Sequence, residues 1–166
     1  MPGINDFLTL AERDRQVSMK MEEDFPQPWA VAAAEYHIQQ SVEKQLEALI
    51  LLYGENPEFT HNIVKLTSHC EKLVVTIPEC LDDISDTLTL WETSSWYDPF
   101  ISFTEKKYGK AVQAYDELSR MIGEKRRNSD TRKPINNDRN PARNGISSQY
   151  AIRAGVFIFL FSPLSP

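Results

Sequence analysis

A chain of 166 residues with a net charge of -6, 41% hydrophobic residues and 10% aromatic residues is long enough for one domain with its own core. Its two cysteines, Cys70 and Cys80, belong to no Cys-x-x-Cys or Cys/His cluster, which argues against a disulfide framework and a structural zinc site. The first residues carry charges in a helical pattern and no apolar signal-peptide core, so we expect a cytoplasmic protein without metal or cofactor.

The two parts of the chain carry opposite charge. Residues 1–123 hold 10 basic and 21 acidic side chains, a net charge of -11, whereas residues 124–166 hold 8 and 3, a net charge of +5. An acidic body repels a polyanion at long range, so nonspecific nucleic-acid binding would need cations from the basic segment or a partner. We predict one folded domain over 1–123 and a basic, flexible, Asn- and Pro-rich tail over 124–166.

Two long helices are expected in the first third of the chain. Apolar residues at helical spacing predict a first helix over residues 5–22, and a second that begins at Pro28 and stops at Gly54. The second helix is apolar on nearly all sides, which is typical of a helix packed between others.

Three further helices follow. The third is predicted to begin with Thr60 as its N-cap and to run through Leu73. The fourth begins with a capping box over residues 76–79 and places Leu81, Ile84, Leu88 and Trp91 on one face. After a loop over residues 92–101, a second capping box at residues 102–105 opens a fifth helix that weakens or ends at Gly123.

These elements predict an all-α fold, an antiparallel bundle of four to five helices, because no segment shows the alternation of a strand. The apolar run at residues 156–161 is too short for a membrane span of about 20 residues. We therefore expect no membrane insertion.

A polar stripe on the second helix offers the best candidate site. His37, Gln40 and Lys44 lie within about 60° of one another around the helix axis, so an imidazole, an amide and an ammonium could together hold an anion such as a phosphate. The same groups could equally fix helix packing through hydrogen bonds. His61 directly follows Thr60, so it either bonds the start of the third helix or joins an anion site there.

The sequence around this stripe resembles the HEPN family. Residues 37–44 read His-x-Gln-Gln-x-x-Glu-Lys, residues 53–54 are Tyr-Gly, and residues 60–63 are Thr-His-Asn-Ile, in the order and spacing of the family's pattern. Residues 95–99 are more weakly similar to the family's Arg-Tyr-Pro-Asp element, which adds Tyr97 and Asp98 as candidates. The resemblance covers residues 5–122.

The resemblance implies a helical bundle that dimerises, is associated with nucleotide or RNA, and is often paired with a minimal nucleotidyltransferase. Many members are ribonuclease toxins with an arginine, four to six intervening residues and a histidine. Here no arginine stands at those positions before His37, His61 or His69, and Trp96 replaces the loop arginine.

We therefore expect a non-catalytic nucleotide- or RNA-binding or interaction module that forms a homodimer. The candidate ligand contacts are His37, Gln40, Lys44, His61, Tyr97 and Asp98. The alternative is a divergent, metal-independent ribonuclease toxin of a toxin–antitoxin pair, with His37 or His61 as base and Lys44 as the stabiliser of the transition-state charge.

Overall fold

The computed structural model describes residues 2–25, 27–94 and 105–130. These residues form helices and contain no strand, which confirms the predicted all-α class. All of them belong to residues 1–134, the first of the two units into which the chain divides. The helices are α1 (Ile4–Glu22), α2 (Pro28–Leu52), α3 (Ile63–Lys72), α4 (Glu79–Asp82), α5 (Ser85–Ser94) and α6 (Glu105–Asp130).

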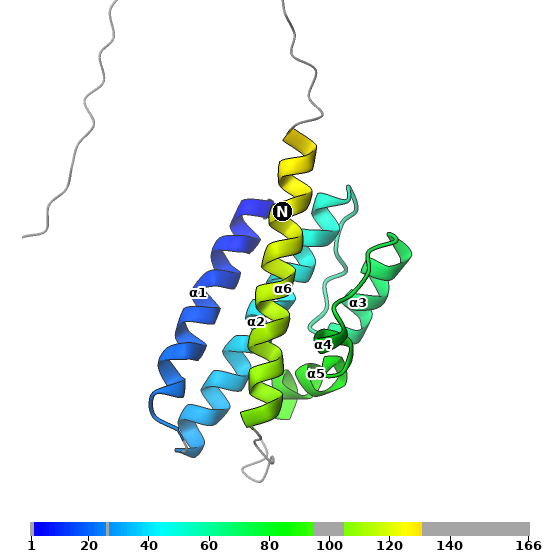
Figure 1. Cartoon of the computed structure of the whole chain (residues 1–166). Coiled ribbons are helices and arrows are strands. Elements are labelled where there is room, and N and C mark those ends of the chain that lie inside the picture. The colour runs from blue at the N-terminus through cyan, green and yellow to red at the C-terminus, as the bar shows by residue number, and fades with distance from the viewer. Residues whose placement is uncertain (1, 26, 95–104, 131–166) are drawn as a thin grey trace, which may run out of the picture. The chain divides into compact units, whose positions relative to one another are not determined.

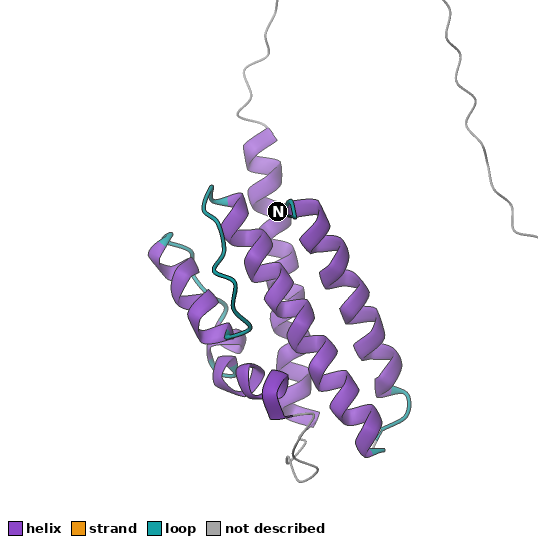
Figure 2. Ribbon diagram, turned by 180° about the vertical axis from the view of Figure 1, so that it is seen from behind, coloured by secondary structure: helices purple, strands orange, loops and turns teal. Residues whose placement is uncertain are grey.

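Three long helices form one side of the bundle. Helix α1 runs antiparallel to α2 and α6, which run in the same direction (Figure 1). The short helices α3, α4 and α5 lie on the side of α2 and α6 away from α1, as the view from behind also shows (Figure 2). Helix α2 contacts α1, α3, α5 and α6, so it is the central element of the fold.

The hydrophobic core surrounds α2 because this helix is buried on nearly all sides, as its sequence predicts. Each neighbouring helix contributes one apolar face to the same core. The face predicted for the fourth helix is confirmed, since its four apolar residues are all buried. Among the largest fully buried side chains are Ile38, Leu46, Leu49, Leu66, Leu81, Leu88 and Leu118.

Both ends of α2 match the prediction. Pro28 occupies the first turn, where its missing N–H costs no hydrogen bond. At the other end Gly54 has a φ of 89°, and its N–H donates to the carbonyl of Leu51 at 3.0 Å. The N–H of Glu55 then donates to the carbonyl of Ile50 at 3.3 Å, which completes a Schellman motif.

The predicted N-cap of the third helix is wrong by two residues. Asn62 is the N-cap, and its side-chain oxygen accepts a hydrogen bond from the N–H of Lys65 at 2.9 Å. The hydroxyl of Thr60 instead accepts from the N–H of Asn62 at 3.2 Å. Both residue types cap helices well, and the one whose side chain reaches the third helical N–H takes the role.

The predicted fourth helix is two helices, α4 and α5, separated by the turn at Asp83 and Ile84. Its predicted capping box is also wrong, because Pro78 is the N-cap of α4 and no side chain caps it. The short turn keeps the apolar residues of both helices on the core side.

The last helix does not end at Gly123 but continues to Asp130. Contacts with the rest of the bundle stabilise this extension: the ammonium of Lys125 lies 3.7 Å from the ring centroid of Tyr53, and Arg126 donates to the side chain of Asn5 at 3.0 Å. Arg127, in the last turn, also interacts favourably with the helix dipole.

Several predictions from the sequence lie outside the described residues. They are most of the loop at residues 92–101, the start of the second capping box at 102–104, the tail beyond residue 130 and its apolar run at 156–161. Among the helices that the structure describes, none is both long and apolar enough to cross a membrane.

Helix α3 ends in a second Schellman motif that has valine where glycine is usual. Val74 has a φ of 60°, a left-handed conformation that is strained for a β-branched residue. Its N–H donates to the carbonyl of Glu71 at 2.8 Å, and the N–H of Val75 donates to that of Cys70 at 3.1 Å. The side chain of Val74 is 90% exposed, so it buries almost no surface in return for the strain.

We therefore expect Val74→Gly to raise the free energy of unfolding by about 1 kcal/mol, because glycine adopts this conformation without strain. Urea denaturation of the two proteins measures the difference. Gly54→Ala is the matched control, since a Cβ at Gly54 would meet no atom within 4 Å and only the backbone conformation is tested. The free energy of unfolding of Gly54→Ala should be lower by about 1 kcal/mol. A destabilised Val74→Gly protein would contradict the assignment of strain.

Candidate functional site

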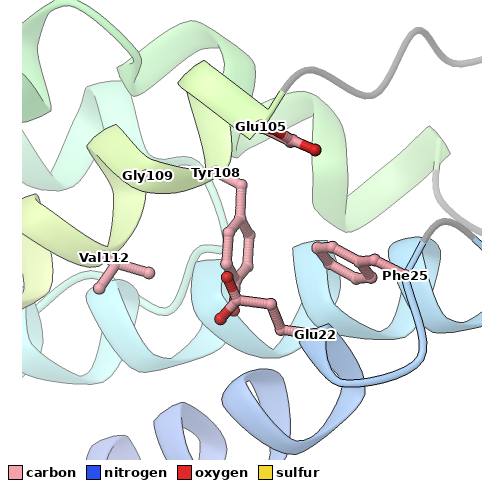
Figure 3. Close-up of a pocket in the computed structure, with 6 residues that line it drawn as sticks. All are labelled: Glu22, Phe25, Glu105, Tyr108, Gly109 and Val112. Carbon is pink, nitrogen blue, oxygen red and sulfur yellow. The ribbon is translucent and has the colours of Figure 1, made fainter.

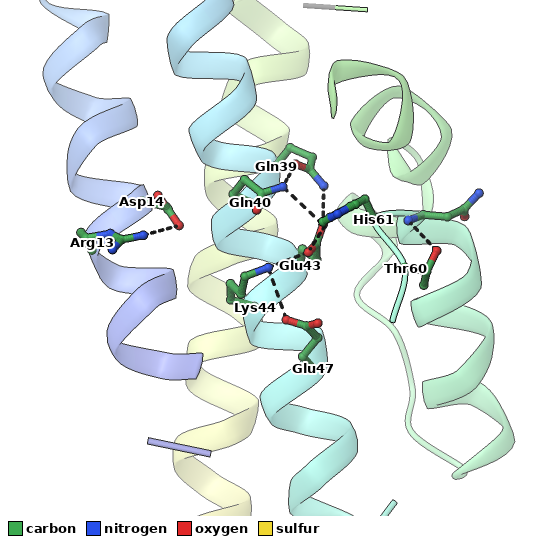
Figure 4. A network of polar contacts seen from close by, with 10 residues as sticks. Arg13, Asp14, Gln39, Gln40, Glu43, Lys44, Glu47, Thr60 and His61 are labelled. Atoms are coloured by element: carbon green, nitrogen blue, oxygen red, sulfur yellow. Dashed lines mark hydrogen bonds and ion pairs between the residues drawn. The ribbon is translucent and has the colours of Figure 1, made fainter. Parts of the chain in front are cut away.

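Four side chains converge on the carboxylate of Glu43, which lies on α2 and is 1% exposed (Figure 4). The donors are Lys44 Nζ at 2.6 Å, Gln39 Nε2 at 2.9 Å, Gln40 Nε2 at 3.4 Å and His61 Nδ1 at 3.1 and 3.2 Å from the two oxygens. We call these five residues the Glu43 cluster. A buried carboxylate needs such partners, because burial without them is costly.

Lys44 is part of this cluster and is not a free cation. Besides Glu43, its ammonium pairs with Glu47 at 3.4 Å, and its side chain is only 17% exposed. Burial acts to lower the pKa of Lys44, but the two carboxylates outweigh it and the pKa is raised. Burial also raises the pKa of Glu47. The positive charge of Lys44 is therefore already balanced within the fold.

His61 connects the Glu43 cluster to the surface. It lies between α2 and α3, and its side chain is 51% exposed although Nδ1 bonds to buried Glu43. An ionised carboxylate can only accept, so it selects the tautomer with the hydrogen on Nδ1, and in the neutral ring Nε2 is then the acceptor. Among the described residues no group bonds to Nε2. The carboxylate thus fixes the ring and leaves one nitrogen for a ligand.

An exposed aromatic ring stands beside this imidazole. Phe59 is fully exposed, and its ring centroid lies 6.3 Å from that of His61 with the planes at 60°. Exposed phenylalanine gains nothing from burial in the fold. Phe59 and His61, which we call the Phe59–His61 edge, therefore present a flat apolar ring next to an oriented hydrogen-bonding group.

His37 has a different partner from the other stripe residues. Its Nδ1 lies 3.1 Å from a carboxylate oxygen of Asp14 on α1, and its ring packs edge-on against Tyr36. Asp14 is itself buried and lies 3.7 Å from the guanidinium of Arg13. The structure thus brings Gln40, Lys44 and His61 together around Glu43, and it ties His37 to α1.

The N-terminus of α3 has few donors left for an anion. The N–H of Ile63 donates to the hydroxyl of Thr89 at 3.0 Å, and that of Lys65 donates to the side chain of Asn62. Because these helix-start groups are bonded within the fold, the alternative of an anion site at this helix end gains no support.

Comparison with known proteins identifies the family. A family model described as HEPN domain matches residues 4–126, about three quarters of the chain. The chain belongs to the HEPN family. Among curated proteins and among solved structures, no significant match was found. Membership supports a role connected with nucleotides or RNA in general.

Sequence reasoning missed the centre of the site in this HEPN domain. Glu43 is not among the candidates from the sequence, whereas in the structure it is the acceptor for the polar groups around it. Its spacing of three and four residues from Gln40 and Gln39 was the available signal, since such residues are neighbours on a helix. Asp14 was missed because nothing in the sequence links it to His37. Tyr97 and Asp98 lie outside the described residues.

Proposed function

We propose that this HEPN domain is a non-catalytic module that binds a nucleotide or RNA at the Phe59–His61 edge. The observation that carries the proposal is the imidazole that buried Glu43 holds in place beside a fully exposed phenylalanine. A base can stack on such a ring whatever its identity, and a neighbouring imidazole can bond to a phosphate or a base edge.

The polar residues of α2 act on the Phe59–His61 edge through Glu43. Gln40 and Lys44 hold the carboxylate that orients His61, so in the proposal they act through His61. His37, whose ring is partly exposed, remains a candidate for a second contact from the same helix face. Tyr97 and Asp98 stay candidates from the sequence alone.

We propose a non-catalytic module because the lysine of the Glu43 cluster, the cation that the described site offers beside His61, is already paired. Cleavage of RNA without metal needs a base and a group that stabilises negative charge on phosphorus. The ammonium of Lys44 is bound to two carboxylates, and no arginine precedes a histidine at the nuclease spacing. The net charge of the Glu43 cluster with Glu47 therefore does not favour a dianionic transition state.

We expect Phe59→Ala and His61→Asn each to weaken binding of a short single-stranded RNA by about tenfold, since loss of one stacked base costs about 1–3 kcal/mol. Fluorescence anisotropy with a labelled oligonucleotide measures the dissociation constants. Trp29→Ala is the matched control: it removes another exposed aromatic, about 20 Å along α2 from Glu43. Equal affinity of all four proteins would show that the ligand binds elsewhere.

The Glu43–His61 pair gives a second candidate function some support. A histidine oriented by a carboxylate is also the arrangement of a general base, as a ribonuclease of a toxin–antitoxin pair would require. An RNA cleavage assay in the presence of EDTA separates the two. Our proposal predicts intact RNA, and cleavage that His61→Ala and Lys44→Ala both abolish would establish the ribonuclease instead.

The family resemblance supports two further parts of the proposal. The module forms a homodimer, and it pairs with a minimal nucleotidyltransferase. Light scattering on the pure protein should give about twice the chain mass of 19.1 kDa. A monomer mass at micromolar concentration would remove the dimer from the proposal and leave the Phe59–His61 edge unaffected.

A further inference from the structure

A pocket of about 500 Å³ lies away from the Glu43 cluster, between the end of α1 and the start of α6 (Figure 3). No predicted site residue lines it. The lining residues are Glu22, Phe25, Glu105, Tyr108, Gly109 and Val112.

The pocket joins two carboxylates to an aromatic corner. Phe25 and Tyr108 pack edge to face with their ring centroids 5.6 Å apart, and the Tyr108 hydroxyl lies 2.9 Å from that of Ser18, which fixes the ring. Glu22 and Glu105 are both exposed, and neither forms an ion pair with a described residue. The six lining residues include two acidic side chains and no basic one, so the lining itself has a net negative charge.

We propose that this pocket binds an arginine side chain of a partner protein. A guanidinium is planar and weakly hydrated, so it can lie against an aromatic ring while its edges donate to carboxylates. Figure 3 shows the carboxylate of Glu22 beside the ring of Tyr108, with the ring of Phe25 across the pocket and Glu105 at its rim, so a guanidinium could contact a ring and a carboxylate together. The net charge of -11 on residues 1–123 also attracts a basic partner at long range.

Gly109 gives the pocket part of its wall and offers a way to fill it. It lies within α6, and a Cβ built there would meet no atom within 4 Å. Glycine inside a helix is less stable than most residues by up to about 1 kcal/mol. A longer side chain at this position has room at the pocket wall and favours the helix, so Gly109→Gln can test the effect of filling the pocket without unfolding the protein.

The test is an NMR titration of the full chain with N-acetyl-L-arginine amide, and with N-acetyl-L-citrulline amide as the uncharged control of the same shape. We expect the arginine compound to shift the amide signals of Gly109 and Val112 with saturation in the millimolar range, as a single side chain binds weakly. Citrulline should shift them at least fivefold less at equal concentration. Equal shifts with both compounds would overturn the proposal.

Variants of the lining residues test whether the arginine compound binds in this pocket. Glu22→Gln with Glu105→Gln, and separately Gly109→Gln, should abolish saturable binding, whereas Glu71→Gln on the exposed face of α3 should leave it unchanged. Gly109→Gln should also keep or raise the melting temperature, which separates a filled pocket from an unfolded one. Binding that survives both sets of changes would refute the site. Tighter binding of free L-arginine than of the blocked compound would overturn the choice of a protein partner.

Discussion

Glu43→Ala is expected to lower the free energy of unfolding by about 3–5 kcal/mol, the usual cost of removing one partner from a buried ion pair. The change leaves the ammonium of Lys44 largely buried with only Glu47 at 3.4 Å, and it removes the acceptor of the buried Gln39 amide. His61 also loses the bond that fixes its ring. Urea denaturation followed by circular dichroism measures the loss.

Two further variants separate a buried charge from a general loss of packing. Glu71→Ala removes an exposed glutamate from α3 and should change stability by less than about 0.5 kcal/mol. Adding Lys44→Met to Glu43→Ala should recover part of the stability, because the uncompensated cation is then gone. If Glu43→Ala alone cost less than about 1 kcal/mol, Glu43 could not be the main partner of a buried Lys44.

Glu35→Gln is expected to stabilise the protein by up to about 3 kcal/mol at about pH 8 and to have little effect near pH 4.5. Glu35 lies on α2, is 2% exposed, and has a buried carboxylate oxygen with no hydrogen-bond partner in the described structure. Burial raises the pKa of its carboxyl to about 7, and Lys107 offsets this only in part.

The direction of this pH dependence follows from how tightly Glu35 binds its proton in the folded and unfolded chains. Between its ordinary pKa of 4.5 and about 7, Glu35 holds its proton more tightly in the folded chain than in the unfolded chain. The free energy of unfolding therefore falls as the pH rises through this window and is lowest, with respect to this group, above about pH 7. Glutamine keeps the shape without the charge, so the difference between the two proteins should grow with pH. A constant difference would show that Glu35 is not the titrating group.

Much of the fold follows from local patterns. Helix α2 was predicted with both ends because Pro28 and Gly54 act through their own backbone preferences, and its apolar surface needs no knowledge of the neighbours. The end of α6 was not predictable in the same way. Gly123 weakens a helix locally, but Lys125 and Arg126 bind Tyr53 and Asn5, which are distant in sequence.

The candidate site, too, could be predicted from the sequence only in part. The polar groups of α2 could be placed on one stripe from helix geometry alone. His61 completes the Glu43 cluster only because the segment between α2 and α3 brings it beside Glu43. No periodic pattern in the sequence encodes the course of that segment. The pocket between α1 and α6 joins residues about eighty positions apart, so only the three-dimensional structure shows it.

Photo-crosslinking tests directly whether RNA binds at the Phe59–His61 edge. A single-stranded RNA with 4-thiouridine would be irradiated with the intact protein, and the crosslinked peptide identified by mass spectrometry. Crosslinks are expected in the segment that carries the Phe59–His61 edge, and Phe59→Ala should abolish them. Crosslinks confined to the basic residues after position 124, unchanged by Phe59→Ala, would contradict binding at this edge.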